Sequence, residues 1–286
     1  MKVKRICVVG GGIMGNQIAQ LAAQSGYEVC MLHHAKTYQS SLSVIKANLQ
    51  DLFIDKGKMS QDEGDAVLNR IKEASDLEEA VAGTQVVIES IPEDKALKQA
   101  LFKKLDEFCA PETILSSNTS SFMISELGAL TKRQDRVIGM HFWNPVTVMR
   151  LIDIIRGIKT SDETYEVIKE LGGRFGKEII TVKDSPGFVV GRLFCVLCNE
   201  AAKILEEGLA TVEDIDKGCE LGLGHAMGPF KTQDMVNGIA ITVHTMNTMR
   251  EVFGDAYLPT LLQRKMMLAG DLGVKAGKGF YDYKKN

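Results

Sequence analysis

Ile6-Cys7-Val8-Val9-Gly10-Gly11-Gly12-Ile13-Met14-Gly15 joins a short apolar run to a G-x-G-x-x-G motif near the start of the chain. Residues 16–24 continue with helical spacing, and Gly26 can end that helix. In such a strand–loop–helix the first glycine makes a tight turn, the second lets the backbone approach a pyrophosphate, and the third allows close helix–sheet packing. The helix N-terminus then faces the anion. The residues expected to contact a dinucleotide are Gly10, Gly12, Ile13, Met14 and Gly15.

Short apolar runs alternate with helical patterns through the first 180 or so residues, which is typical of a parallel sheet covered by helices on both faces. The runs are 6–9, 27–32, 86–88, 113–115, 137–138 and 151–155. From Ser185-Pro186 onward the apolar residues recur at helical spacing. We predict an α/β Rossmann-type doubly wound sheet followed by an all-α C-terminal domain. The expected domains are a dinucleotide-binding domain over residues 1–184 and a helical substrate and dimerisation domain over residues 185–286.

The composition narrows the class of protein. A length of 286 residues corresponds to about two domains, and 45% hydrophobic with 25% charged residues is typical of a globular protein. The formal charge of -3 offers no basic surface to nucleic acid. No apolar run reaches the ~18 residues of a membrane helix, and the N-terminal sequence does not have the pattern of a signal peptide. We therefore expect neither nucleic-acid nor membrane partners.

The cysteines indicate the redox compartment. Six cysteines are too few and too scattered for a disulfide-stapled secreted domain, so we expect a cytoplasmic location. Cys195 and Cys198 form a C-x-x-C pair inside an apolar helical stretch, but no second pair completes a zinc site. We expect these two thiols to be buried and inert, and we expect no metal site.

The position for ribose recognition departs from the usual pattern. An acidic residue is expected about 20 residues after the glycine motif, at the end of the second strand, where it binds the adenosine ribose. His33 occupies this position, and His34 follows it. A neutral imidazole can accept a hydrogen bond from a ribose hydroxyl, whereas a protonated one near Lys36 could tolerate a 2′-phosphate. The sequence favours NAD and leaves NADP open.

Polar residues gather in or directly after three of the predicted strands. They are the segment 116–121, the segment 141–145 and Asp153, which lies within an apolar run. Ligands of doubly wound sheets bind outside the carboxyl ends of the strands, which makes these residues site candidates. Because an unpaired buried carboxylate costs several kcal/mol, Asp153 needs a partner, and His141 would satisfy it.

A His141–Asp153 pair suits the oxidation of a secondary alcohol. Removing hydride from the carbon requires removing the hydroxyl proton as well, and imidazole titrates near neutral pH. The carboxylate would fix the imidazole tautomer and stabilise the imidazolium. Ser120 and Asn144 could hold the same oxygen in line for transfer. The purely structural alternatives are a capping loop around Ser120 and a turn at Asn144-Pro145.

Six segments together resemble the short-chain L-3-hydroxyacyl-CoA dehydrogenase family over essentially the full chain. They are Val8 to Gly15, Val87-Ile88-Glu89-Ser90-Ile91-Pro92-Glu93, Ser117-Asn118-Thr119-Ser120-Ser121, His141-Phe142-Trp143-Asn144-Pro145, Asp184-Ser185-Pro186-Gly187-Phe188 and Gly277-Lys278-Gly279-Phe280-Tyr281. Each segment alone is only modestly specific for this family, whereas the six segments together are highly specific for it.

The resemblance implies an NAD-dependent oxidoreductase that interconverts an L-3-hydroxyacyl-CoA and its 3-oxoacyl-CoA, with a short acyl chain favoured. It implies His141 as general base, and Ser120 and Asn144 as contacts of the hydroxyl and of the cofactor. It also implies a homodimer joined through the C-terminal helices. Further implied contacts are Glu93, Lys98 and Lys275 near the nicotinamide half of NAD, and Lys56 or Lys58 at the phosphates of coenzyme A.

Three positions depart from the family pattern. His33 replaces the ribose-binding Asp, Asp153 replaces the Glu that pairs with the histidine, and Gly191 replaces the Asn before Arg192. Shortening Glu to Asp withdraws the carboxylate by about one methylene, and losing the Asn removes a substrate hydrogen bond. Two alternatives therefore stay open: a paralogue that oxidises a β-hydroxy acid or sugar acid without coenzyme A, and a non-catalytic dinucleotide-binding protein. Fatty-acid breakdown and butyrate formation both stay open as the pathway.

Overall fold

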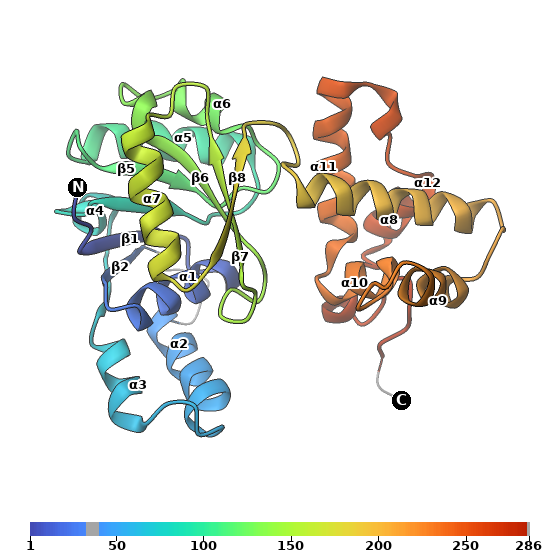
Figure 1. Ribbon diagram of the computed structural model, residues 1–286, viewed down its shortest axis with the longest axis horizontal. Helices are drawn as coiled ribbons and strands as arrows, with labels where there is room; N and C mark the ends of the chain where they lie inside the picture. The colour runs from blue at the N-terminus through green and yellow to red at the C-terminus, as the bar shows by residue number, and fades with distance from the viewer. Residues whose placement is uncertain (33–39, 285–286) are drawn as a thin grey trace. The chain divides into compact units, whose positions relative to one another are not determined.

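The computed structural model describes residues 1–32 and 40–284. These residues form two compact units (Figure 1). The first consists of Met1–Thr119 and Met123–Asp184, and the second of Ser120–Phe122 and Ser185–Asn286. Within the described ranges, none of the helices combines the length and the apolar character needed to cross a lipid bilayer.

The first unit is built on one sheet, in which the described residues contribute eight strands in the order β3-β2-β1-β4-β5-β6-β7-β8. The strands are β1 (Arg5–Val9), β2 (Glu28–Leu32), β3 (Ile71–Glu73), β4 (Val86–Glu89), β5 (Ile114–Ser117), β6 (Val137–Phe142), β7 (Leu151–Arg156) and β8 (Glu178–Lys183). All neighbours pair in parallel except β6 and β7. The short connection 143–150 explains this exception, because parallel neighbours need a crossover of a dozen or more residues. The expected doubly wound sheet is confirmed, with β3 and β8 as additional edge strands.

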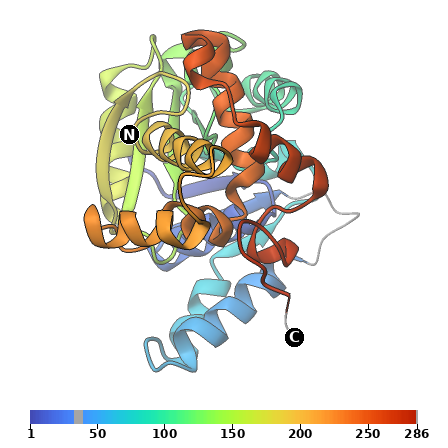
Figure 2. The same ribbon diagram turned by 90° about the vertical axis from the view of Figure 1, so that its right-hand side faces the viewer.

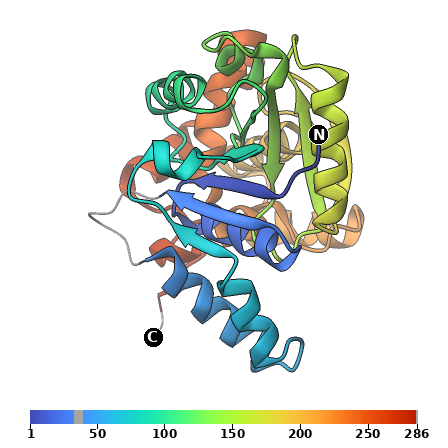
Figure 3. The ribbon, with the colours of Figure 1, turned by 90° about the vertical axis from the view of Figure 1, so that its left-hand side faces the viewer.

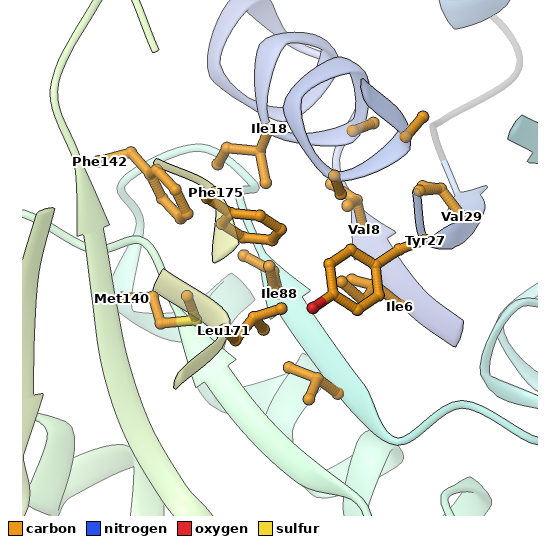
Figure 4. Packing of buried hydrophobic residues seen from close by; sticks show 14 of the residues in the cluster. Ile6, Val8, Ile18, Tyr27, Val29, Ile88, Met140, Phe142, Leu171 and Phe175 are labelled. Atoms are coloured by element: carbon orange, nitrogen blue, oxygen red, sulfur yellow. The ribbon is translucent and has the colours of Figure 1, made fainter. Parts of the chain in front are cut away.

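Helices cover both faces of this sheet (Figures 1 and 3). They are α1 (Ile13–Gln24), α2 (Ser41–Leu49), α3 (Gln61–Leu68), α4 (Leu77–Val81), α5 (Lys95–Phe108), α6 (Ile124–Gly128) and α7 (Asp162–Arg174). The largest buried cluster lies on the side of α1 and α7, where Ile18 and Leu171 meet alternate residues of the strands, such as Val8 and Ile88 (Figure 4). This alternation follows from the period of two along a strand.

A helical hairpin extends from the first unit. It consists of α2, one π-helical turn at Gln50–Ile54, and α3 (Figures 1 and 3). The turn that joins Ile54 to α3 lies at the end of the hairpin farthest from the sheet. Ser60 and Glu63 form a reciprocal capping box that starts α3 after this turn.

The second unit is helical, as expected (Figure 2). Its α-helices within the described residues are α8 (Val190–Glu206), α9 (Val212–Gly222), α10 (Pro229–Met235), α11 (Gly238–Phe253) and α12 (Leu261–Ala269). Phe230 of α10 packs with Ala202 of α8 and Ile215 of α9. Met246 and Met249 of α11 pack with Cys195 in a second cluster. Buried clusters this small are typical of a unit of about 100 residues.

Two buried aspartates attach the C-terminal segment to the helices. Asp234 accepts hydrogen bonds from the backbone N–H groups of Phe280 and Tyr281, at 3.1 and 2.9 Å. Asp216 accepts one from the Tyr281 hydroxyl, at 2.7 Å. Burial raises the pKa of the Asp234 carboxyl, and the Phe280 and Tyr281 N–H groups act against that rise. This network explains why glycine occupies position 279, since the Cβ of any other residue there would lie 2.1 Å from Asp234 Oδ1.

Asp184, at the end of the first unit, caps a helix of that unit. Its two carboxylate oxygens accept hydrogen bonds from the N–H groups of Ile124 and Ser125, at 2.8 and 2.7 Å. These are the first two N–H groups of α6, which have no partner within the helix. Asp184 therefore joins the residues after β8 to the start of α6.

We expect Asp184→Ala to lower the free energy of unfolding by about 1–2 kcal/mol, because two helix N–H groups lose their acceptor. Scanning calorimetry should show a melting temperature several degrees lower. Asp184→Asn keeps one carbonyl oxygen and should lie between the wild type and the alanine variant. An alanine variant that melts with the wild type would show that water replaces the carboxylate at no cost.

Candidate active site

The glycine loop leaves the start of α1 accessible from outside the sheet. Gly10 has φ +122°, and a Cβ there would lie 2.4 Å from the Ser90 carbonyl oxygen. A Cβ on Gly15 would lie 1.8 Å from the Gly10 carbonyl oxygen, whereas one on Gly12 would have no described atom within 4 Å. Gly12 is the N-cap residue of α1, and no side chain caps the first N–H groups of this helix. The first helical residue, Ile13, is half exposed. The loop therefore offers backbone N–H groups and open space, which fits the pyrophosphate of a dinucleotide.

His141 and Asp153 form a direct hydrogen bond. They are opposite residues of β6 and β7, and His141 Nδ1 lies 3.0 Å from Asp153 Oδ2. Asp153 is fully buried, and His141 is 7% exposed. Trp143 Nε1 donates to the other Asp153 oxygen at 3.3 Å, and the indole ring packs edge-on against the imidazole. The shorter aspartate thus reaches the histidine because the antiparallel register places the two residues face to face.

The loop after His141 is held from two sides. Gln17 of α1 accepts a hydrogen bond from the Val146 N–H at 2.6 Å, and its amide nitrogen lies 3.5 Å from Asn144 Oδ1. Lys177 donates to the carbonyl oxygens of Val146 and Met149, at 2.5 and 2.7 Å. Burial lowers the pKa of Lys177. Asn144 is therefore an exposed side chain on a loop whose backbone is fixed.

A second polar cluster lies at the carboxyl ends of β4 and β5. Lys98 Nζ lies 2.6 Å from Glu89 Oε1 and 3.1 Å from Glu93 Oε2. Ser117 donates to the other Glu89 oxygen at 2.5 Å, and Thr119 donates to Glu93 Oε1 at 2.5 Å. Burial raises the pKa of Glu89, and the ammonium of Lys98 acts against that rise. Glu93 and Lys98, which the sequence singled out, thus contact each other directly.

Other candidate residues lie elsewhere in the chain. Ser120 belongs with the second unit, where its neighbour Ser121 hydrogen-bonds Thr245 at 3.3 Å. Lys275 is exposed on the second unit, and its backbone N–H donates to Asn237 Oδ1 at 2.9 Å. Lys56 is exposed in the turn of the α2–α3 hairpin. His33 lies outside the described residues.

Neither the cysteines nor the residues that commonly bind metal ions form a second functional site in the described part of the chain. Cys195 and Cys198 are buried in α8, and burial raises the pKa of both thiols, that of Cys195 to about 11. A raised thiol pKa disfavours the reactive thiolate. Across residues 1–32 and 40–284, no group of three or more His, Cys, Asp or Glu residues is arranged to hold a metal ion.

Family models match almost the whole chain. Residues 5–185 match the NAD-binding domain of 3-hydroxyacyl-CoA dehydrogenase, and residues 187–283 match the C-terminal domain of the same enzyme. The chain belongs to the 3-hydroxyacyl-CoA dehydrogenase family. Members of this family are NAD-dependent oxidoreductases, so the dinucleotide expected from the glycine loop is NAD.

Individual family members are similar along their full length. The chain is 43% identical to a probable 3-hydroxybutyryl-CoA dehydrogenase of Bacillus subtilis, over 100% of this chain and 99% of the relative. It is 38% identical to a 3-hydroxybutyryl-CoA dehydrogenase of Clostridioides difficile, over 98% and 100%. The crystal structure of (S)-3-hydroxybutyryl-CoA dehydrogenase from Ralstonia eutropha matches with a TM-score of 0.92 at 41% identity, over 99% and 100%.

The structure adds residues to the site of this 3-hydroxyacyl-CoA dehydrogenase family member that the sequence patterns did not single out. Glu89 joins Ser117 and Thr119, which belong to the predicted segment 116–121, and Gln17 and Lys177 fix the loop of Asn144. Glu89 carried the same signal as Asp153, a charge within an apolar run. Gln17 and Lys177 are ordinary polar residues whose contacts depend on segments far apart in the chain.

Of the three departures from the family pattern, the structure describes two. Asp153 still reaches His141, at 3.0 Å. A Cβ on Gly191 would have no described atom within 4 Å, so an asparagine would fit at the start of α8.

We expect Gly12→Ala and Gly15→Ala to separate cofactor binding from folding. Gly12→Ala has room for its methyl group, so it should keep the melting temperature and weaken NADH binding about ten-fold or more, because the methyl occupies the space that the pyrophosphate needs. Gly15→Ala should lower the melting temperature, because its methyl meets the Gly10 carbonyl. Calorimetry and NADH fluorescence titration measure the two effects. Equal NADH affinity in Gly12→Ala and wild type would argue against a pyrophosphate at this loop.

Proposed function

We propose that the protein interconverts a short-chain L-3-hydroxyacyl-CoA and the corresponding 3-oxoacyl-CoA, with NAD(H) as the redox cofactor. The observation that carries this proposal is the 3.0 Å contact between His141 and Asp153 in a chain of the 3-hydroxyacyl-CoA dehydrogenase family. The short acyl chain is supported by relatives named for 3-hydroxybutyryl-CoA at 38–43% identity.

His141 acts as the general base in alcohol oxidation and as the general acid in the reverse reaction. With Nδ1–H donating to Asp153, Nε2 is the basic ring nitrogen and takes the proton of the substrate hydroxyl. The Asp153 carboxylate stabilises the imidazolium that forms, and Trp143 keeps that carboxylate oriented. Because His141 is 7% exposed, little water competes for its proton.

The remaining candidate residues hold the substrate and the cofactor. When bound, NAD would supply the acceptor for the hydride that leaves C3 of the substrate. Ser120 and Asn144 hydrogen-bond the reacting oxygen and the cofactor, and Lys56 contacts the phosphates of coenzyme A. In the cofactor site the glycine loop with Ile13 and Met14 binds the pyrophosphate, His33 binds the adenosine ribose, and Glu93, Lys98 and Lys275 lie near the nicotinamide half.

The two parts of the chain divide these tasks. Residues 1–184 bind the dinucleotide, and residues 185–286 bind substrate and form the dimer. We place the enzyme in the cytoplasm, since all six of its cysteines, each within the described residues, are free thiols.

A homodimer through the C-terminal helices is supported by an apolar surface on the second unit. Leu193, Val189 and Val196 of the α8 region are 68%, 44% and 42% exposed. A groove of about 240 Å³ is lined by Leu193, Leu197, Met227 and neighbouring residues. Large exposed apolar patches mark interaction sites, and a second copy of the chain is the partner that the family resemblance implies.

Reduction of acetoacetyl-CoA with NADH tests the proposed reaction. Wild type should turn over acetoacetyl-CoA rapidly with NADH, and it should act poorly on free acetoacetate and poorly with NADPH. His141→Gln should lower turnover by about 100-fold or more because the general base is lost. Its melting temperature and NADH affinity should stay close to wild type. Unchanged turnover in this variant, or a wild type that acts equally on free acetoacetate, would contradict the proposal.

The dimer is tested by the mass of the protein in solution. Wild type should sediment at twice the chain mass of 31.4 kDa. Leu193→Asp should shift the protein toward monomer, since a buried carboxylate at the interface is costly. Ile158→Asp, at an 84% exposed residue of the first unit, is the matched control and should remain dimeric. A monomeric wild type would refute the proposed assembly.

A further inference from the structure

A pocket of about 330 Å³ lies in the first unit, at the edge of the sheet where the strands begin. Lys2 and Val3, which precede β1, line it together with Tyr27, which precedes β2, and with one face of α7. Sites for small organic ligands start at about this volume. The glycine loop follows the opposite end of β1, a strand of five residues, so about 17 Å of strand separates this pocket from the cofactor site.

The hydroxyl group of Tyr27 is available to a ligand in this pocket. Tyr27 is 7% exposed, and its ring packs edge-on against Phe175. Figure 4 shows its hydroxyl end directed toward Leu171, which also lines the pocket. Within residues 1–32 and 40–284 this hydroxyl has no hydrogen-bond partner, and its oxygen is not closed off from solvent. A side chain that is held by packing thus presents an unused polar group.

Arg174 supplies a second donor beside this hydroxyl. Its Nε and Nη2 donate to Glu170 Oε1 at 3.0 and 2.8 Å, which leaves Nη1 without an acceptor in the described part of the chain. Burial raises the pKa of Tyr27, and the guanidinium of Arg174 acts against that rise. The phenol is therefore protonated at neutral pH and can donate its hydrogen to an acceptor next to Arg174.

The charges around the pocket favour an anion. Lys2 is exposed and lies within ion-pair distance of no carboxylate in the described ranges. Among the described lining residues the one acid is Glu170, which already pairs with Arg174 at 2.8 Å. Two cationic side chains and one carboxylate leave a formal charge of one positive unit, so a ligand with one negative charge would neutralise the pocket.

Backbone carbonyl groups at this edge of the sheet do not favour a cation instead. The helices α1 and α7 end here, and the carbonyl groups of a last helical turn can attract positive charge. The Ala22 carbonyl, however, accepts a hydrogen bond from the Tyr27 N–H at 3.1 Å, and the Leu171 carbonyl accepts one from the Phe175 N–H at 3.0 Å. These acceptors are already used by the chain.

The remaining wall of the pocket is apolar. Leu171 belongs to the main buried cluster of the first unit, and Val3 and Val167 pack against that cluster while partly exposed. Covering these side chains removes apolar surface from water, which favours a ligand with a hydrocarbon part. The pocket therefore combines hydrogen-bond donors and positive charge with an apolar surface.

We propose that this pocket binds a small monocarboxylate with a short apolar body. The carboxylate accepts hydrogen bonds from the Tyr27 hydroxyl and from Arg174 Nη1, and it pairs with the ammonium of Lys2. Its hydrocarbon part lies against Val3 and Leu171. This site is separate from the one that carries out the proposed reaction, and binding here requires neither NAD nor an acyl-CoA.

The test titrates the full-length protein with hexanoate and follows binding by NMR. Hexylamine and hexanol have the same hydrocarbon chain, with a positive charge and with no charge. Hexanoate should bind at least ten-fold more tightly than either. Saturating NADH should leave the Kd of hexanoate within about two-fold, because strand length separates the two sites. Tighter binding of hexylamine, or displacement of hexanoate by NADH, would overturn the proposal.

Two variants locate the bound hexanoate. Tyr27→Phe removes only a hydroxyl without a partner in the chain, so the melting temperature should stay close to wild type. The Kd of hexanoate should rise about ten-fold, as expected for the loss of a hydrogen bond to a charged group. Arg174→Gln should raise this Kd by a similar factor, which keeps the proposal testable if Tyr27→Phe does not fold.

Arg150→Gln is the matched control. Arg150 forms the same kind of exposed ion pair, with Glu178 at 2.8 Å, but does not line the pocket. The Kd of hexanoate in this variant should equal that of wild type. If Tyr27→Phe and Arg174→Gln both bind hexanoate as tightly as the control, the carboxylate is bound elsewhere and the proposal is wrong, whatever the outcome of the acetoacetyl-CoA assay.

Discussion

Parallel pairing of β1, β4 and β5 is the constraint on which the cofactor site depends. The register aligns Val9 with Glu89 and Glu89 with Ser117, so the three strands end at one edge of the sheet. The glycine loop, the Glu89–Lys98 pair and the serine-rich loop then start from that edge. A shift by one residue in either pairing would turn the side chains of that strand to the opposite face, and the contacts of Glu89 with Lys98 and Ser117 would be lost. The apolar residues of the same strands, which pack against α1 and α7, prevent that shift.

The one antiparallel pair of the sheet has a different consequence. Between antiparallel strands, opposite residues have Cβ atoms about 5 Å apart, which suits a direct contact of short polar side chains. His141 and Asp153 are such a pair, and the short connection 143–150 between their strands fixes their register. Gln17 and Lys177 then hold this connection from α1 and from the residues after α7. The histidine is thus oriented by strand geometry and the following asparagine by loop contacts.

Buried charges in both units follow one rule, which is that each carboxylate meets several donors. Asp153 meets an imidazole and an indole, and Glu89 meets an ammonium, a hydroxyl and a backbone N–H. Asp234 meets two backbone N–H groups and the hydroxyl of Tyr283. An isolated buried carboxylate would be strongly destabilising, so the donors must be in place for these positions to be occupied at all. A charge within an apolar stretch of sequence therefore points to a network, whose members come from other parts of the chain.

Local patterns in the sequence were sufficient for the doubly wound sheet, the helical second half and the glycine loop, because strand and helix periods and glycine geometry act over a few residues. The contact of His141 with Asp153 was expected because a charge within an apolar run needs a partner. Local patterns were not sufficient for β3, a three-residue edge strand with little local signal, or for the antiparallel pair. The sequence also named Glu93 and Lys98 only through resemblance. Their contact with each other, and the buried Glu89 beneath them, were decided by the tertiary structure, because hydrogen bonds between strands and helices join residues whose distance in the sequence carries no information about their distance in space.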